Sequence, residues 1–309
     1  MKKVILIGLG SIFALIVIII LYAQLTWDSK TFDAPYPDIT ASTDSAVIER
    51  GRYLAYGPAH CSTCHVPMDK IMDVENGEVI PLSGGWELTL PLGTFRAPNI
   101  TPDMETGIGK LTDAEIARTL RHSVGSDGRI IFPFMPFQHL SDEDLTAIVS
   151  FLRSQPPVKH DMKRTEYSFM GRIIGTVMGM KPVEPTIEIP KSVKREVTAE
   201  YGSYLAKSVA NCYGCHTDRD LMTGAFTVNE VAGGLIFEPD AYSQGWAFHV
   251  PNLTHHPSGI MYEWNEDAFV ARLKAGRVHQ GSPMPWGPFR GWTKTICVRC
   301  IATCARWSL

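Results

Sequence analysis

The pentapeptide Cys61-Ser62-Thr63-Cys64-His65 stands in the first third of the chain, and a second copy, Cys212-Tyr213-Gly214-Cys215-His216, stands in the last third. Cys-x-x-Cys-His is the attachment signature for c-type haem, in which two thiols bond to the porphyrin and the adjacent histidine takes the iron. One such pentapeptide can arise by chance, but two copies in one chain are harder to dismiss. The sequence therefore predicts two covalently bound haem c groups.

The two pentapeptides lie at matching places in an internal repeat. Gly51-x-Tyr53-Leu54-Ala55 precedes the first motif as Gly202-x-Tyr204-Leu205-Ala206 precedes the second. After each motif come two glycines, a Pro-Asn-Ile/Leu-Thr segment and a Met-Pro-aromatic loop, at offsets of 149 to 153 residues. These segments are Gly84-Gly85 and Gly233-Gly234, Pro98–Thr101 and Pro251–Thr254, and Met135–Phe137 and Met284–Trp286. The repeat predicts two similar domains.

An apolar run opens the chain. Val4 to Ala23 carries no charge and has about 20 residues, roughly the length that a helix needs to cross a bilayer. Lys2 and Lys3 favour the cytoplasmic side for the N-terminus, so residues 1–24 are predicted to be a membrane anchor with the rest outside. A cleaved signal peptide is the alternative, although its apolar core would usually be shorter.

The other boundaries follow from composition and from the repeat. Residues 25–45 are predicted to be a tether, 46–157 the first domain, 158–192 a linker and 193–309 the second domain. The apolar piece of the linker from Phe169 to Met180 fits a domain surface, an interdomain seam or a membrane surface. The formal net charge of −3 is too small to indicate a nucleic-acid partner.

Helix signals accompany each motif. Thr112 and Glu115 form a capping-box pattern, and a matching helix start lies near Asn265. Ser141 has the character of an N-cap, and an apolar stripe follows it until Pro156-Pro157 ends the helix. That stripe consists of Leu145, Ile148 and Leu152.

Each haem iron also needs a ligand on the side away from its histidine. Met135 and Met284 fall at matched positions, about 70 residues after the histidine of each motif, and are followed by proline and an aromatic residue. Prolines stiffen the backbone, so such a loop can present a thioether. Packing alone is the alternative explanation for the two methionines. His122 and His139 are lower-ranked ligands in the first domain, because the second has no matching histidines.

Histidine–methionine ligation fills both axial positions of the iron and raises its potential relative to two histidines. An iron without a vacancy favours electron transfer over catalysis. A zinc site would instead need a second ligand pair near each motif, and a redox dithiol would not need the trailing histidine. Pro98 and Pro251 either offer their carbonyls to the second ring nitrogen of the motif histidines or only form turns.

Both motifs, the Pro-Asn segments, Ile108-Gly109 and the Met-Pro-aromatic loops together resemble the bacterial di-haem cytochrome c family. The resemblance covers about residues 46–157 and 193–292. It implies two tandem class I cytochrome c domains, mostly α-helical, each wrapping one haem. Members of this family occur as free periplasmic carriers and as membrane-tethered cytochrome subunits of alcohol and other dehydrogenases.

The resemblance does not specify the electron donor or acceptor. The favoured function is a single-electron carrier at the bacterial inner membrane, with its haem domains in the periplasm and a dehydrogenase subunit or terminal oxidase as partner. The alternative is an oxidoreductase with one catalytic haem, of the peroxidase or thiosulfate-oxidising type; a structural or sensory haem protein is a weaker third. A peroxidase needs an open or weakly ligated iron, which the paired methionine loops disfavour. We therefore expect an electron-transfer protein or subunit rather than an enzyme.

The C-terminus departs from the repeat. After Thr293 the repeat predicts a helix like residues 142–154, but the chain continues with Cys297, Cys300 and Cys304. One permitted DNA coding of this tail, translated in a reading frame shifted by two bases, gives a helical sequence that resembles residues 142–154 of the first repeat. Residues 294–309 are therefore interpreted as the product of a frame shift, with a genuine divergent tail as the alternative. A second domain that ends in this tail lacks its closing helix and is predicted to fold less stably than the first.

Overall fold

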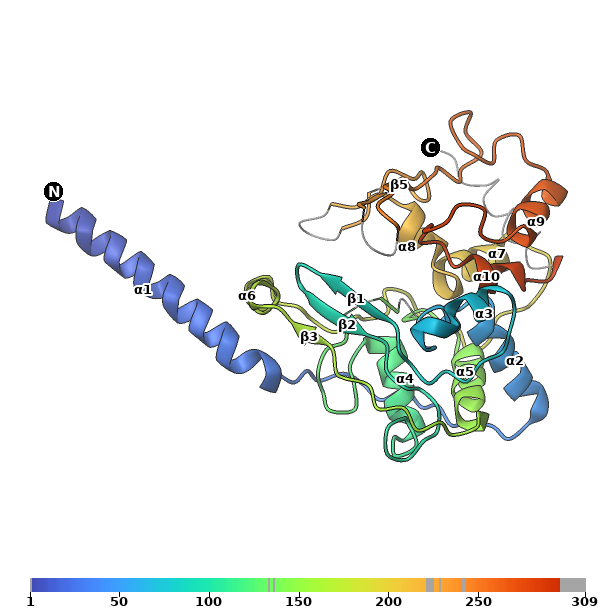
Figure 1. Ribbon diagram of the computed structural model, residues 1–309, viewed down its shortest axis with the longest axis horizontal. Helices are drawn as coiled ribbons and strands as arrows, with labels where there is room; N and C mark the ends of the chain where they lie inside the picture. Colours follow the sequence, from blue (N-terminus) through green and yellow to red (C-terminus); the bar gives the residue numbers. More distant parts are fainter. Residues whose placement is uncertain are drawn as a thin grey trace.

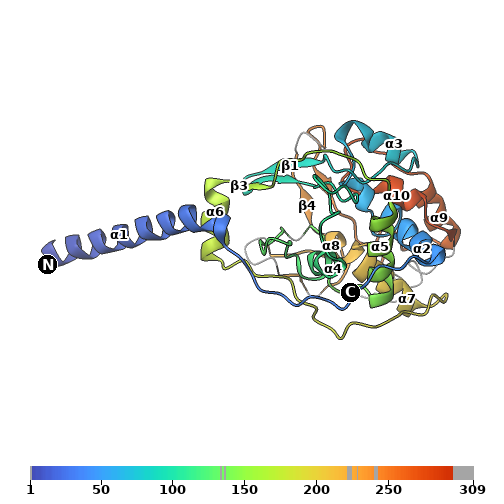
Figure 2. The same ribbon diagram turned by 90° about the horizontal axis from the view of Figure 1, so that it is seen from below.

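The computed structural model describes residues 2–132, 134–135, 137–220, 225–227, 229–239 and 243–294. In this part of the chain, ten α-helices and five short strands confirm the predicted helical class. Helix α1 (Lys2–Thr26) projects from a rounded body that holds the other elements (Figures 1 and 2). The prediction about the tail falls on residues 295–309, which lie outside the described residues.

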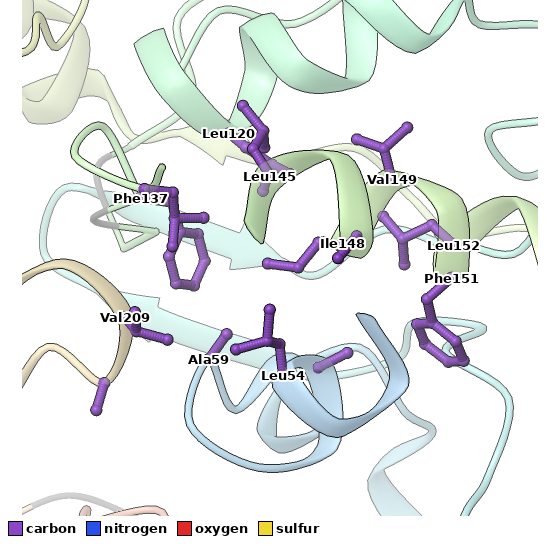
Figure 3. Packing of buried hydrophobic residues seen from close by; sticks show 14 of the residues in the cluster. Leu54, Ala59, Leu120, Phe137, Leu145, Ile148, Val149, Phe151, Leu152 and Val209 are labelled. Atoms are coloured by element: carbon purple, nitrogen blue, oxygen red, sulfur yellow. The ribbon is translucent and has the colours of Figure 1, made fainter. Parts of the chain in front are cut away.

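The first repeat is organised around α2 (Ser45–Tyr56) and α5 (Asp142–Ser154), which cross in direct contact (Figure 1). At the crossing, a Cβ on Gly51 would lie 1.8 Å from the carbonyl oxygen of Ala147, so only glycine lets the two backbones meet. Apolar side chains fill the space around this crossing (Figure 3). They include Leu54, Ile148, Phe151 and Leu152.

Two predicted helix starts of the first repeat are confirmed. α4 (Asp113–His122) begins at the capping box, in which the Glu115 carboxylate accepts from the Thr112 amide at 2.7 Å. The Ser141 side chain accepts from the Asp144 amide and begins α5. Both helices therefore start where local side-chain chemistry satisfies the free amides of the first turn. The short helix α3 (Ile71–Glu75) follows the first motif.

A small antiparallel sheet, ordered β1-β2-β3, is absent from the sequence prediction. It consists of β1 (Glu87–Leu90), β2 (Gly93–Arg96) and β3 (Glu166–Tyr167). A Cβ on Gly93 would lie 2.3 Å from the Glu166 carbonyl oxygen, so glycine permits the pairing of β2 with β3. Because β3 belongs to the predicted linker, that segment is folded onto the first repeat.

The predicted tether, residues 25–45, also lies along the first repeat. The Phe32 amide donates to the Gly128 carbonyl at 2.7 Å, and the Ala41 amide donates to the Asp113 carboxylate at 2.8 Å. Two main-chain donors of the predicted tether are therefore satisfied by the first repeat.

The second repeat is built from shorter elements. They are α7 (Ala199–Tyr204), a π-helical turn (Leu205–Val209), α8 (Cys212–His216), β4 (Ile236–Phe237), β5 (Phe248–His249), α9 (Glu266–Lys274) and α10 (Trp286–Arg290). α9 begins at the predicted Asn265, whose side chain accepts from the Ala268 amide at 2.9 Å.

The buried apolar residues of both repeats form one continuous cluster. Leu54 and Leu145 of the first repeat belong to it together with Leu205, Val209 and Trp286 of the second. α10 packs on α3, which brings the end of the second repeat against the segment that follows the first motif (Figure 1). The division into two cytochrome c domains, residues 46–157 and 193–309, therefore stays a prediction.

Candidate haem-attachment sites

The first motif forms a tight turn that begins in the left-handed region, where His60 has φ 41°. The His65 amide donates to the Cys61 carbonyl at 2.9 Å and closes the turn. The thiols of Cys61 and Cys64 are free, and burial raises the pKa of each to about 12. Both are therefore protonated at neutral pH.

The residues around the two motifs disfavour a zinc site. Within the residues that the structure describes, no group of three or more His, Cys, Asp or Glu side chains could hold a metal ion. The second ligand pair that a zinc site requires is thus not found beside either motif there.

His65 is held in one tautomer. Its side chain is buried, and Nδ1 lies 2.8 Å from the carbonyl oxygen of Pro98. A carbonyl can only accept, so Nδ1 carries the proton and Nε2 keeps a free lone pair, as a histidine ligand of iron requires. Burial lowers the pKa of His65 and keeps the ring neutral. The predicted role of the proline carbonyl is confirmed.

The second motif repeats this geometry. Nδ1 of the buried His216 lies 3.0 Å from the carbonyl oxygen of Pro251, and burial lowers the pKa of the ring. Asn211, which precedes the motif, has φ 53° and corresponds to His60. The Cys212 thiol is free, and burial raises its pKa to about 12; Cys215 is free and exposed.

The glycine pairs bring each proline segment against its histidine. The Gly84 amide donates to the His65 carbonyl at 2.9 Å, and the Gly233 amide donates to the His216 carbonyl at 2.7 Å. The two glycines have φ 76° and 75°. A Cβ on Gly84 would lie 2.6 Å from the main chain of Pro98, so a larger residue would push the segment away from the histidine.

The predicted methionine loops also share a conformation. The Phe137 amide donates to the Met135 carbonyl at 3.0 Å, and the Trp286 amide donates to the Met284 carbonyl at 2.9 Å. Both methionines are half-buried and pack against the shared core. The turn therefore follows the sequence repeat, while their binding to iron remains a prediction.

The lower-ranked histidines hold the linker on the first repeat. Nδ1 of His122 lies 3.2 Å from the Val183 carbonyl oxygen. Nε2 of His139 accepts from the Thr186 amide at 3.0 Å. Each ring thus has a protein partner in the segment 158–192, which gives both histidines a structural role.

A buried ion pair fixes the Met284 loop. Nη2 of Arg277 lies 2.8 Å from the Glu75 carboxylate, and the two side chains are 9% and 7% exposed. Arg277 also donates to the carbonyls of Ser282 and Met284. A Cβ on Gly287 would lie 2.5 Å from the Cα of Glu75, so α10, which follows the loop, lies directly on α3. Sequence reasoning missed this pair, because its members are 202 residues apart.

His60 lies where the two motifs approach each other. Its ring centroid is 5.9 Å from that of Phe289 in α10, and its side chain interacts with the main chain of Ala210, two residues before Cys212. Burial lowers the pKa of His60 from 6.5 to about 4, and the interaction with Ala210 opposes this shift. The residue before the first motif therefore contacts the residues before the second.

This burial predicts a pH dependence of stability. Between pH 4 and 6.5 the folded state binds fewer protons at His60 than the unfolded state, so the free energy of unfolding falls as pH falls through this window. We expect His60→Asn to reduce the loss between pH 7 and 4 by about 2–3 kcal/mol. Asparagine is chosen because Asn211 adopts the same left-handed conformation.

The measurement is guanidinium unfolding at pH 7, 5 and 4. His279→Asn, at an exposed position, is the control. An identical pH dependence in His60→Asn and the unsubstituted protein would contradict the prediction.

Known proteins are similar to this chain in sequence over most of its length, although no protein-family model matches it. The chain is 30% identical over 225 residues to a di-haem c-type cytochrome of Cereibacter sphaeroides, covering 70% of this chain and 69% of that protein. It is 31% identical over 242 residues to the cytochrome c subunit of a quinone alcohol dehydrogenase of Gluconobacter oxydans, which covers 76% of this chain and 48% of that protein. It is 27% identical over 250 residues to a fructose dehydrogenase cytochrome subunit of Gluconobacter japonicus, which covers 79% of this chain and 48% of that protein.

The chain thus spans about half the length of these dehydrogenase subunits and more than two thirds of the di-haem cytochrome. Sequence similarity of this extent agrees with the repeated motif, the histidine–carbonyl hydrogen bonds and the matched loops. The chain belongs to the bacterial di-haem cytochrome c family.

Proposed function

We propose that this protein is an electron carrier with two covalently attached haem c groups, one at each motif. The observation that carries the proposal is the repeated histidine geometry. In both repeats Nδ1–H donates to a proline carbonyl, at 2.8 Å for His65 and 3.0 Å for His216. This bond fixes the ring and leaves Nε2 for the iron.

Some of the site residues attach the haem and others bind its iron. Each haem would be attached covalently by two cysteines, Cys61 and Cys64 in the first site and Cys212 and Cys215 in the second. Ligation of iron falls to His65 with Met135 and to His216 with Met284. Haem supplies a one-electron iron couple, and two protein ligands on each iron exclude substrates, which favours electron transfer. Each site belongs to its own cytochrome c domain, residues 46–157 and 193–309, joined by the linker 158–192.

The partner is a dehydrogenase subunit, which feeds single electrons into one haem, and a terminal oxidase takes them from the other. Support comes from relatives that are cytochrome subunits of alcohol and fructose dehydrogenases. α1 serves as the anchor in the bacterial inner membrane, with the haem domains in the periplasm. The helical stretch Lys2–Ser29 has a mean hydropathy of 3.2 in its most apolar window, none of which is buried in the protein, although a signal sequence meets the same criteria.

Counting covalent haem tests the proposal. The purified protein is expected to carry two haems, and replacing both cysteines of either motif with alanine is expected to leave one. Cys300→Ala, outside both motifs, is the matched control and should keep two. Intact mass and the pyridine haemochrome spectrum give the count; an unchanged count in either double variant would contradict the assignment.

The oxidised spectrum separates carrier from catalyst. Charge-transfer absorption of methionine-ligated ferric haem is expected from both sites, and is expected to be lost from one site in Met135→Ala and in Met284→Ala. A high-spin ferric haem in the unsubstituted protein, or turnover of peroxide, would place catalysis at one iron instead.

A further inference from the structure

Helix α6 (Phe169–Val177) packs against the protein through glycines. A Cβ on Gly171 would lie 2.0 Å from the Leu92 carbonyl oxygen, and a Cβ on Gly175 would lie 2.3 Å from the Trp27 ring. Positions four residues apart share a helix face, so the glycine face is the inward one. A surface helix of a globular protein usually turns its apolar face inward.

The large apolar side chains of this segment occupy the opposite side. Four of them are more than half exposed: Phe169, Met170, Val177 and Met178. With the half-buried Ile173 and Ile174 between them, they cover about half of the helix circumference at 100° per residue. The apolar core formed by the described residues contains none of these six. α6 therefore leaves most of an apolar face exposed in that part of the chain.

α6 is fixed at the end of α1. Gln24 Nε2 donates to the Phe169 carbonyl at 3.0 Å, and Arg172 pairs with Asp28 at 2.9 Å. The uncharged run Val4–Ala23 is about 30 Å long as a helix, close to the thickness of the hydrocarbon core. Residues 24–28 then lie at the outer interface of a membrane that α1 spans, and α6 lies at the same level.

The direction of the α6 axis is consistent with a position at the membrane interface. In Figure 1 α6 is seen along its axis while α1 extends across the view, and in Figure 2, after a quarter turn, α6 runs across the end of α1. A helix that crosses the end of a spanning helix lies along the membrane plane, as interfacial amphipathic helices do.

Aromatic and basic side chains surround this junction. The Trp27 and Tyr167 rings are 4.9 Å apart, and Lys30 Nζ lies 5.9 Å from the centre of the Trp27 ring. Tryptophan and tyrosine are enriched at the interfaces of membrane proteins, where lysine side chains reach the headgroups. Trp27 is only 6% exposed, so its ring packs beneath α6 rather than facing lipid, and the junction matches the headgroup region by composition alone.

We propose that α6 lies flat in the outer interface of the bilayer that α1 spans, with its apolar face among the lipid acyl chains. The inference rests on the proposed anchoring role of α1. It assigns a phospholipid surface as the occupant of this face, and it gives the body a second attachment beside the spanning helix.

A photocrosslinking experiment on the full chain in phosphatidylcholine nanodiscs tests this. The photoreactive residue p-benzoylphenylalanine replaces Phe169 in one sample, Phe13 in the middle of α1 in a second, and Met72 of α3 in a third. All three positions are more than half exposed, and α3 lies at the end of the body away from α1 (Figures 1 and 2). After irradiation, mass spectrometry counts lipid adducts.

We expect lipid adducts in the samples with the photoreactive residue at positions 13 and 169, and no lipid adduct in the sample with it at position 72. An adduct at 13 without one at 169 would overturn the inference and leave the anchor intact, and equal labelling at 72 would overturn it as well. No adduct at 13, with an intact mass that lacks α1, would instead overturn the anchor on which the inference rests.

Discussion

Arg277→Met is expected to lower the free energy of unfolding by about 3–5 kcal/mol, because it leaves the Glu75 carboxylate buried without its counter-ion. The two groups are 2.8 Å apart and less than a tenth exposed, so solvent screens them poorly. The variant also removes donors from the carbonyls of the Met284 loop. We therefore expect the methionine charge-transfer absorption to weaken at one haem and persist at the other.

Two controls define this effect. The double variant Glu75→Gln/Arg277→Met removes both charges and should recover much of the stability, since removing a whole buried pair costs far less than breaking it. Arg52→Met breaks an exposed pair with Glu49 and should change stability by at most about 0.5 kcal/mol. Guanidinium unfolding at pH 7 measures all three. A loss in Arg277→Met no larger than that in Arg52→Met would refute the role of the buried pair.

Gly51→Ala is expected to destabilise the protein by about 3 kcal/mol. The new Cβ would lie 1.8 Å from the Ala147 carbonyl oxygen and 2.7 Å from the Phe151 Cβ. These atoms belong to the backbone and the rigid base of a side chain of α5, so relief requires the two helices to separate. Alanine's higher helix propensity, worth up to about 1 kcal/mol, offsets only part of this cost.

Thermal and guanidinium unfolding of three glycine variants measure this effect. Gly10→Ala in α1, where nothing lies within 4 Å, should leave stability unchanged. Gly202→Ala, the repeat counterpart of Gly51, is expected to have a milder effect if the second domain lacks its closing helix. Equal losses in Gly51→Ala and Gly202→Ala would contradict the prediction that the second domain lacks its closing helix.

Local chemistry made much of the site predictable. The capping box at Thr112, the N-caps at Ser141 and Asn265 and the carbonyl of Pro98 beside His65 all depend on neighbouring residues or on the repeat. A repeat strengthens such predictions, because the same short pattern must work twice.

The missed features depend on segments far apart in the chain. The strand β3 pairs with β2 across about 70 residues, and Glu75 meets Arg277 across 202 residues. The apolar residues of α6 fit several surroundings equally well in the sequence, and only its contacts with Trp27 and Leu92 show which face turns inward. Pattern within a segment cannot specify such pairings, since they are set by the assembled fold.

The shared core has a consequence for how the protein is made. Under the proposed export from the N-terminus, the first motif would leave the cytoplasm well before Arg277 and Phe289, which pack against Glu75 and His60. Until these residues arrive, Cys61 and Cys64 would belong to an incomplete core. On this proposal the packing around the first site is completed only when the second repeat has been made, and a chain truncated within its last third is expected to be a poor scaffold for the haem of the first site.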